Sequence, residues 1–381
     1  MSLPVLLHSG LKGAPSLSFA TNGSMNALLL ATLVNGFNTQ AVSSATAAGG
    51  VVTFNFPTDP GFPDKYTVVI EGSSNASVNG TFRVQSAASN QVLVAIPGVP
   101  DGAVGGTMTM KFAPLGWTRA FNSGTTTAAY RQGGGAAHKR FLRVYDGNVS
   151  TASHFYLRAY ENMTAISTGT GPFPTSGEKA GNGVDIYCAN SPARPWIIVG
   201  TPRAFYFLTD PGNDYSAVVP PVFTPGFGAS FSGFAFGEMD RVQRAGDVYA
   251  YFLSVEGLGS PYFHGSRAST QAANSRPNLA ATSWGGAKWS GEFNNPDPVS
   301  GNLIFHDAPV IIELFNGMYG VRGYMPGILS HQSRLIVDGL PNLPGKMYTA
   351  IPGLTGRAML MSVGWGSSEF MVKMDEDWGD V

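Results

Sequence analysis

The sequence has little cysteine and no long apolar run, and its opening segment is unlike a secretory signal. Its one cysteine, Cys188, cannot form an internal disulfide and has no partners at metal-ligand spacing. No apolar stretch approaches the ~20 residues that a helix needs to span a bilayer. The opening segment MSLPVLLHSGLKG has a short apolar run and no basic lead, unlike a secretory signal. We therefore expect synthesis in a cytoplasm, no membrane insertion and no signal-directed export.

Charge is also scarce in this chain. Asp, Glu, Lys and Arg make up 12% of the residues, about half of the usual share. The formal net charge is −1, so the chain as a whole offers no electrostatic basis for direct nucleic-acid binding. At 381 residues and 43% hydrophobic, it can form two or three domains with buried cores. Such low charge predicts a surface covered by other subunits, and the alternative is a monomer with a Ser, Thr and Asn surface.

One short helix is expected, within an N-terminal segment of residues 1–41 that belongs to the main body. Ser24 is the candidate N-cap, and Gly36 stands where a C-terminal stop belongs. The apolar residues that share one helix face are Met25, Leu28, Leu29 and Leu33. A helix of about a dozen residues is marginal alone. We expect it to pack on the edge of a sheet, and an oligomer-forming helix is the alternative.

Residues 42–112 are predicted to form a small inserted β domain. The composition changes at Ala41 to Ser, Ala, Gly and Thr, and turn signals then separate five short β-rich runs. These runs are Gly50–Phe56, Tyr66–Glu71, Gly80–Gln85, Gln91–Ile96 and Gly106–Phe112. Strands of this length and spacing favour a small antiparallel barrel or sandwich. Such an insertion is tolerated at an exposed loop whose two ends lie close together.

Residues 113–256 are predicted to form a central β domain. After the block PLGWTRAF and a linker rich in Gly and Thr, the runs Phe141–Asp146 and Phe155–Met163 alternate apolar residues with Arg. This alternation directs Leu142, Val144 and Leu157 inward and places Arg143 and Arg158 on the outer face. Trp117 and Phe121 are expected to cover the sheet, and a turn is expected over Ser167–Thr175.

Further strands are predicted along the rest of the chain. Residues 196–200 and 205–208 are expected to form a hairpin with both faces largely buried, and a second strand pair is expected around Arg244-Ala245-Gly246. Residues 257–381 form the last predicted region, a long irregular loop up to residue 300 followed by a β-rich segment. The predicted fold class is therefore mainly β, with a β-sandwich-like main body, one short N-terminal helix and a small inserted antiparallel barrel or sandwich.

No motif in the sequence specifies catalysis. A nucleophile elbow, a phosphate-binding loop and a dinucleotide fingerprint are all absent, and the 24 acidic residues are too scattered to single out a carboxylate pair. Gly133-Gly134-Gly135 is typical of a hairpin tip, and Asp375-Glu376-Asp377 of a solvated or subunit-contacting tail. The dispersed histidines without metal-site spacing are His8, His138, His154, His264, His306 and His331. We therefore expect no catalytic, cofactor-binding or metal-binding residues.

Two sets of residues are candidates for contact with a partner. Trp284 and Trp289 lie in the long loop and could stack on sugar rings, although core or interface packing is the alternative. Arg143 and Arg158 could contact an acidic neighbour, and the alternative is a solvated strand face. They belong to the main local basic excess, which comprises Arg119, Arg131, Lys139, Arg140, Arg143 and Arg158.

Several blocks together resemble a known family. They are ALLLATLVNGF, PLGWTRAF with TAAYRQG, FLRVYD, AYENM-AISTGTGPFPT, ARPWIIVGTPRAFYF, FGEMDRVQRAGDVYAYFLS and YMPGIL. In this order they resemble virion structural proteins encoded in the late operons of tailed double-stranded DNA bacteriophages and prophages. The segment ASVNGTFRV…AIPGVPDGAVGGTMTMKFAP likewise resembles a small β module inserted in phage tail proteins. FLRVYDG departs from the usual double acid after that strand.

The resemblance implies a non-enzymatic structural protein of the virion. Such a protein would assemble as an oligomer in the tail, neck or baseplate, with copies of itself and other virion proteins as partners. A host-attachment role, as an adhesion protein that binds cell-surface glycan, is the alternative. A capsid-associated decoration or head fibre protein is a second alternative. The family supplies no catalytic residues to transfer to this chain.

Overall fold

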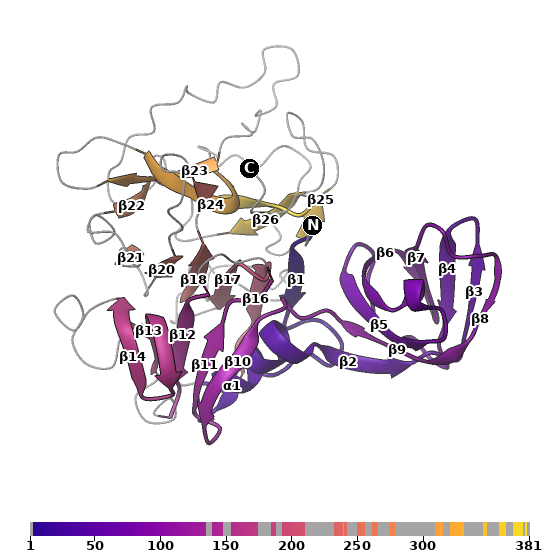
Figure 1. The fold of residues 1–381 in the computed structure, drawn as a ribbon, viewed down its shortest axis with the longest axis horizontal. Coiled ribbons are helices and arrows are strands. Elements are labelled where there is room, and N and C mark those ends of the chain that lie inside the picture. Colours follow the sequence, from indigo (N-terminus) through magenta and orange to yellow (C-terminus); the bar gives the residue numbers. More distant parts are fainter. Residues whose placement is uncertain are drawn as a thin grey trace, which may run out of the picture.

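The protein is mainly β, as its sequence predicts, and Figure 1 shows a layered main body with a separate barrel beside it. In this computed structural model, the described residues are 3–134, 139–147, 154–173, 184–187, 193–209, 232–238, 240–241, 250–255, 261–265, 275–278, 309–314, 321–330, 346–348, 358–362, 369–375 and 378. The predicted fold class, with its sandwich-like body, short helix and small inserted β domain, is confirmed.

The inserted unit is an antiparallel barrel. Its strands are β2 (Phe37–Ala41), β3 (Ser44–Ala48), β4 (Val51–Asn55), β5 (Thr67–Ser73), β6 (Gly80–Ala88), β7 (Gln91–Ala95), β8 (Gly102–Val104) and β9 (Gly106–Phe112), with the 3-10 turn η2 (Ala76–Val78) between β5 and β6. They hydrogen-bond in the order β2-β9-β5-β6-β7-β4-β3-β8. Because β2 runs into β3, and β8 into β9, these two bent strands pair along their length and close the ring.

Alternating burial explains why this segment forms a barrel. Along β4 the side chains of Val52 and Phe54 are fully buried while their neighbours are partly exposed, and β9 buries Met108, Met110 and Phe112 in the same way. Closure leaves the barrel without long unpaired edges. The first strand begins at Phe37, ahead of the predicted boundary at residue 42, because FNTQA already pairs with β9.

The helix holds the two ends of the barrel together. It comprises α1 (Ser24–Leu29) and a π-helical turn, η1 (Leu30–Asn35), and Gly36 ends it at a φ of 73°. A Cβ at Gly36 would lie 2.3 Å from the carbonyl oxygen of Phe112, so the chain enters and leaves the barrel at adjacent points. The predicted N-cap is wrong. Gly23 occupies the cap, and the Ser24 hydroxyl donates instead to the Ser18 carbonyl at 2.6 Å.

The main body begins with a sheet that we call the front sheet. Its strands are β10 (Thr118–Ser123), β11 (Thr127–Arg131), β12 (Phe141–Tyr145), β13 (His154–Ala165), β14 (Thr168–Phe173) and β15 (Val184–Tyr187). The strands β10 to β14 pair antiparallel in chain order, and β15 pairs with β13. Leu142, Val144 and Leu157 are fully buried on one face, as predicted. The alternation therefore sets an inner face and an outer face.

A middle sheet packs on the inner face of the front sheet. It contains β1 (Val5–His8), β16 (Trp196–Gly200), β17 (Ala204–Thr209), β18 (Ser232–Glu238), β20 (Ala250–Val255) and β21 (Pro261–Gly265). Aromatic contacts join the two layers, with the Phe155 ring 6.3 Å from Phe207 and the Phe173 ring 6.2 Å from Phe236. Every residue of β16 and β17 is buried. This confirms the prediction of a hairpin that is buried on both faces.

A back sheet lies on the opposite side of the middle sheet (Figure 1). It contains β22 (Ser275–Asn278), β23 (Pro309–Leu314), β24 (Val321–Ser330), β25 (Lys346–Tyr348), β26 (Ala358–Ser362) and β27 (Glu369–Lys373), and β19 (Asp240–Arg241) pairs with β24. The Tyr206 hydroxyl of the middle sheet donates to the Pro326 carbonyl at 2.9 Å. The Tyr206 ring lies 5.5 Å from that of Trp378. The middle sheet is therefore covered on both faces.

Three sequence predictions about loops are wrong. The expected turn at Ser167–Thr175 contains β14, whose Gly169 leaves room for the Tyr160 ring on the neighbouring strand. The expected Gly- and Thr-rich linker after Phe121 contains the end of β10 and all of β11, whose short Thr and Ala side chains stand opposite larger residues of β12. The expected long loop 257–300 contains β21 and β22.

Candidate functional site

The outer face of the front sheet carries interleaved arginines and aromatic rings. Strand register places Phe141 opposite Tyr160, Arg143 opposite Arg158, and Tyr145 opposite Tyr156. On the neighbouring strand β11, Arg131 lies opposite Phe141 and Ala129 lies opposite Arg143. Phe121 on β10 lies opposite Ala129. We call this surface the aromatic–arginine face, and it comprises Phe121, Arg131, Phe141, Arg143, Tyr145, Tyr156, Arg158 and Tyr160.

The middle row of the face joins two like charges. Arg143 and Arg158 lie directly opposite each other on antiparallel strands, so their positive charges repel. The Arg143 Nε donates to the Ile166 carbonyl at 3.0 Å. The Arg158 guanidinium lies 5.9 Å from the centre of the Tyr160 ring, and its buried Nε has no hydrogen-bond partner. The pair is therefore held in place while part of its donor capacity remains unused.

Stacked rings flank the arginine pair on both sides. On one side, the Tyr145 and Tyr156 rings lie 6.2 Å apart with an angle of 25° between them, and His154 continues the stack at 6.5 Å from Tyr156. On the other side, Phe121 stacks on Phe141 at 6.1 Å, and the Arg131 guanidinium covers the same ring at 5.3 Å. Phe141 is buried, whereas the other rings of the face are half-buried. Flat, half-buried rings beside cations can contact a partner over a large area at low conformational cost.

The surroundings of the face are electropositive. Residues 113–173 contain six Lys and Arg and two Asp and Glu, a net charge of +4, whereas the whole chain has −1. One of the two acids, Asp146, is fully buried on the other side of the sheet. The outer face of the front sheet is therefore suited to a partner that carries negative charge.

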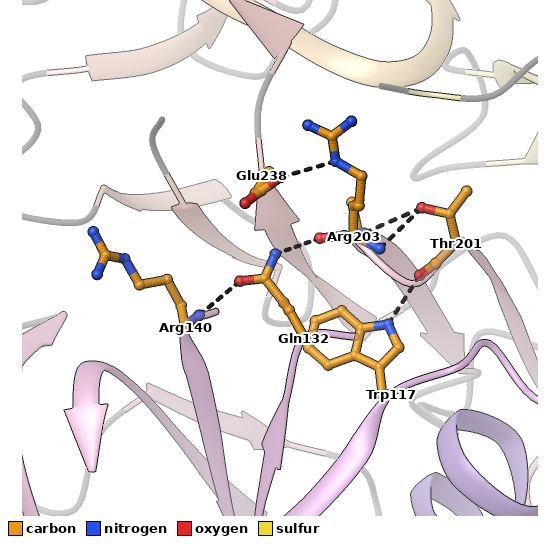
Figure 2. A network of polar contacts seen from close by, with 7 residues as sticks. Trp117, Gln132, Arg140, Thr201, Arg203 and Glu238 are labelled. Carbon is orange, nitrogen blue, oxygen red and sulfur yellow. Dashed lines mark hydrogen bonds and ion pairs between the residues drawn. The ribbon is translucent and has the colours of Figure 1, made fainter. Parts of the chain in front are cut away.

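A second polar cluster joins the front and middle sheets (Figure 2). Gln132 accepts a hydrogen bond from the Arg140 backbone N–H at 2.9 Å, and its own amide donates to the Arg203 carbonyl at 2.5 Å. The Trp117 indole donates to the Thr201 carbonyl at 2.9 Å. The first contact lies within the front sheet, and the bonds to Arg203 and Thr201 cross to the middle sheet. The cluster therefore fixes the register between the layers.

An ion pair completes this junction. The Nε of Arg203 lies 2.9 Å from a carboxylate oxygen of Glu238, whose side chain is only 2% exposed. Arg140 is buried nearby, and its burial lowers the pKa of its guanidinium while Glu161 and Glu238 oppose that shift. Because the Glu238 carboxylate is bound to a cation inside the protein, its arrangement is that of a structural anchor rather than of a free acid.

A fully buried carboxylate of the front sheet binds the start of the helix. Asp146 accepts hydrogen bonds from the Asn26 backbone N–H at 3.1 Å and from its side-chain amide at 2.9 Å. Tyr130 donates to the Asn26 carbonyl at 2.9 Å. Burial raises the pKa of Asp146, and these hydrogen bonds act in the opposite direction. A carboxylate from the front sheet thus caps the N-terminus of α1 in place of Ser24.

His8 is a contact between the body and the barrel. The Gly10 N–H donates to Nδ1 at 3.1 Å, so the neutral ring carries its proton on Nε2, which lies 2.9 Å from the Tyr66 hydroxyl. Burial lowers the pKa of His8 to about 4. The neutral form therefore joins β1 to the barrel at physiological pH.

The structure brings together only some of the predicted site residues. Arg143 and Arg158 share the aromatic–arginine face, whereas Trp284 and Trp289 lie outside the described residues. Sequence reasoning missed the tyrosines of the face. The signal was present in FLRVY and FYLRAY, where the outward positions hold Phe, Arg and Tyr and then Tyr, Arg and Tyr, but only the strand register aligns them.

No family model matches the chain, and no curated protein matches it. Within the described part of the chain, no helix is long and apolar enough to cross a membrane. In the same residues, no group of three or more His, Cys, Asp or Glu side chains is placed to hold a metal ion.

Proposed function

We propose that this chain is a non-enzymatic structural protein of a tailed bacteriophage virion, and that it assembles as an oligomer in the tail, neck or baseplate. The block order from ALLLATLVNGF to YMPGIL supports the family. The aromatic–arginine face is the observation that supports assembly, because Tyr and Arg are enriched where protein surfaces bind each other. Its partners would be copies of itself and other virion proteins.

The distribution of apolar side chains limits how such an oligomer would form. Among the described residues, Leu3 is the only exposed large hydrophobic side chain, at 36%. Where burial is described, the front sheet, β16 to β18 and the barrel bury their large apolar residues within one chain. Contact through these parts would therefore rely on aromatic rings, arginines and strand edges rather than on a broad apolar surface.

The buried acids support a role without catalysis. Asp146 is bound to the N-terminus of α1, and Glu238 is bound to Arg203, so both carboxylates hold elements of the fold together. A general acid or base has to reach a substrate proton. Neither of these two groups is arranged for that purpose.

Deleting the gene tests the proposal. In a phage that carries it, we expect lysates without complete tails, or with tails that lack a ring or cluster, when they are imaged by electron microscopy. Complementation with the intact gene should restore complete particles. Normal particles that adsorb and infect at wild-type efficiency after deletion would contradict a structural role.

A host-surface adhesion function is the second candidate, and the Tyr145–Tyr156 stack favours it, because paired rings beside arginines can also bind sugars. Purified protein would then bind cell-surface glycan on an array. Loss of that binding in Tyr156→Ala would locate the site on the aromatic–arginine face. Loss in Trp284→Ala or Trp289→Ala would locate it in the segment that contains these tryptophans.

A further inference from the structure

We propose that the aromatic–arginine face binds a carboxylate-bearing surface of a second copy of this chain. The inference rests on the proposed function, and it deepens that function by naming one subunit contact. Its starting point is the Arg143–Arg158 pair, two like charges that lie opposite each other on neighbouring strands. Such a pair is unfavourable in the isolated chain. A bound anion that contacts both guanidinium groups would remove the repulsion.

The face has the dimensions and donors for a carboxylate. Among the described residues, the buried Nε of Arg158 has no hydrogen-bond partner, so the guanidinium gains an acceptor only if a carboxylate displaces the groups that cover it. The aromatic rows lie two residues away along each strand, a spacing of roughly 6 to 7 Å. An Asp or Glu side chain that enters between these rows would meet cations below it and rings on either side. The rings would exclude water and strengthen the ion pairs.

The charge distribution favours a second copy as the occupant. Residues 113–173 have a net charge of +4 and the whole chain has −1, so the remaining residues carry −5. A contact between this face and a different surface of the next copy would therefore be attractive. Because the two surfaces differ, the contact is heterologous, and repeated heterologous contacts generate rings or filaments. Such geometry is what a multi-copy tail, neck or baseplate component requires.

Reversing the charge of Arg158 distinguishes an effect on self-association from an effect on the stability of the subunit. In Arg158→Glu, the like-charged pair becomes a pair of opposite charges, so the thermal midpoint of the subunit should stay the same or rise. Self-association, measured by sedimentation velocity over a concentration series, should weaken by at least about tenfold. Wild-type association should also fall as NaCl is raised.

Arg119→Glu is the matched control. It makes the same change in net charge on the same sheet, but Arg119 lies opposite Tyr130, whose side chain belongs to the inner face. Its association should stay within about twofold of the wild type. Equal weakening in both variants would mean that net charge alone matters, and it would overturn the assignment of the face.

Cross-linking identifies the acidic partner directly. In Arg158→Lys, a carbodiimide should couple the introduced amine to a carboxylate that touches the face. Mixing chains of normal and heavy isotope composition distinguishes links between copies from links within one chain. We expect links between copies, to acids outside residues 113–173. Links found only within one chain would contradict the proposal.

Other outcomes distinguish this inference from the proposed function. If wild-type and Arg158→Glu proteins associate equally, the face is not the contact, while assembly through another surface stands. If the wild type stays monomeric at every concentration and binds a heparin column through Arg158, the occupant is a polyanion, and the second-copy assignment is wrong. If deleting the gene leaves virions intact, the proposed function fails independently of these results.

Discussion

Single residues show how this chain uses its buried titratable groups. Asp146, His8 and Glu238 each bind a partner from a distant part of the sequence, and each joins two elements. Sequence patterns identified none of them, because their partners lie far away along the chain. The N-cap of the helix was mispredicted for the same reason. Ser24 has the residue type and position of a cap, but the Asp146 carboxylate, 120 residues from Asn26, accepts the hydrogen bond of the Asn26 N–H.

Removing the Asp146 carboxylate tests its capping role. Asp146→Ala should lower the free energy of unfolding by about 2 to 4 kcal/mol, because the helix loses its cap and Asn26 is left with unsatisfied donors. Tyr130→Phe is a milder comparison that removes one hydrogen bond to Asn26 and should cost about 1 kcal/mol. Urea denaturation measures both values. Equal stability of Asp146→Ala and the wild type would contradict the role.

His8 predicts how stability depends on pH. Its folded pKa of about 4 is below the ordinary value of 6.5, so the unfolded chain binds more protons between these two values. Stability is therefore complete above about pH 6.5 and is lost as the pH falls towards 4, by up to about 3 kcal/mol. His8→Gln should remove this component. Urea denaturation at pH 7, 5.5 and 4 compares the two proteins, and an unchanged pH profile in the variant would refute the assignment.

At the scale of elements, large apolar residues predicted strands well. The alternating runs VVTFN and FLRVY and the continuous apolar run WIIVG all form strands. Strand β3, with the sequence SATAA, was missed because its inward residues are Ala45 and Ala47, which are buried but too small to produce a hydrophobic signal. For the candidate site, the sequence predicted that Arg143 and Arg158 face outward. It could not predict that they are opposite each other, because register depends on the turn between the strands.

Gly36, between the helix and the first strand of the barrel, gives a prediction about stability. Gly36→Ala should destabilise the protein by at least about 2 kcal/mol, because φ is 73° and the new Cβ would meet the Phe112 carbonyl. Gly98→Ala is the matched control, since Gly98 has a φ of 84° with nothing within 4 Å of the added Cβ. It should cost only about 1 kcal/mol. Thermal unfolding of both variants checks the difference.

At the scale of the whole molecule, the chain consists of a layered body and a barrel. The middle sheet of the body lies between two others, and the barrel closes its own strands. On the described surface, the aromatic–arginine face places rings and arginines side by side. We infer that assembly relies on this face, whereas the low charge of the sequence alone suggested broad apolar burial between subunits.

Quantitative mass spectrometry of purified virions tests the central claim most directly. The account predicts that this chain is present in density-purified particles, in a fixed ratio to the major tail or capsid protein, and in several copies per particle. The ratio should persist through repeated purification and salt washes. Abundant protein in infected cells, with none in the purified particles, would contradict the account.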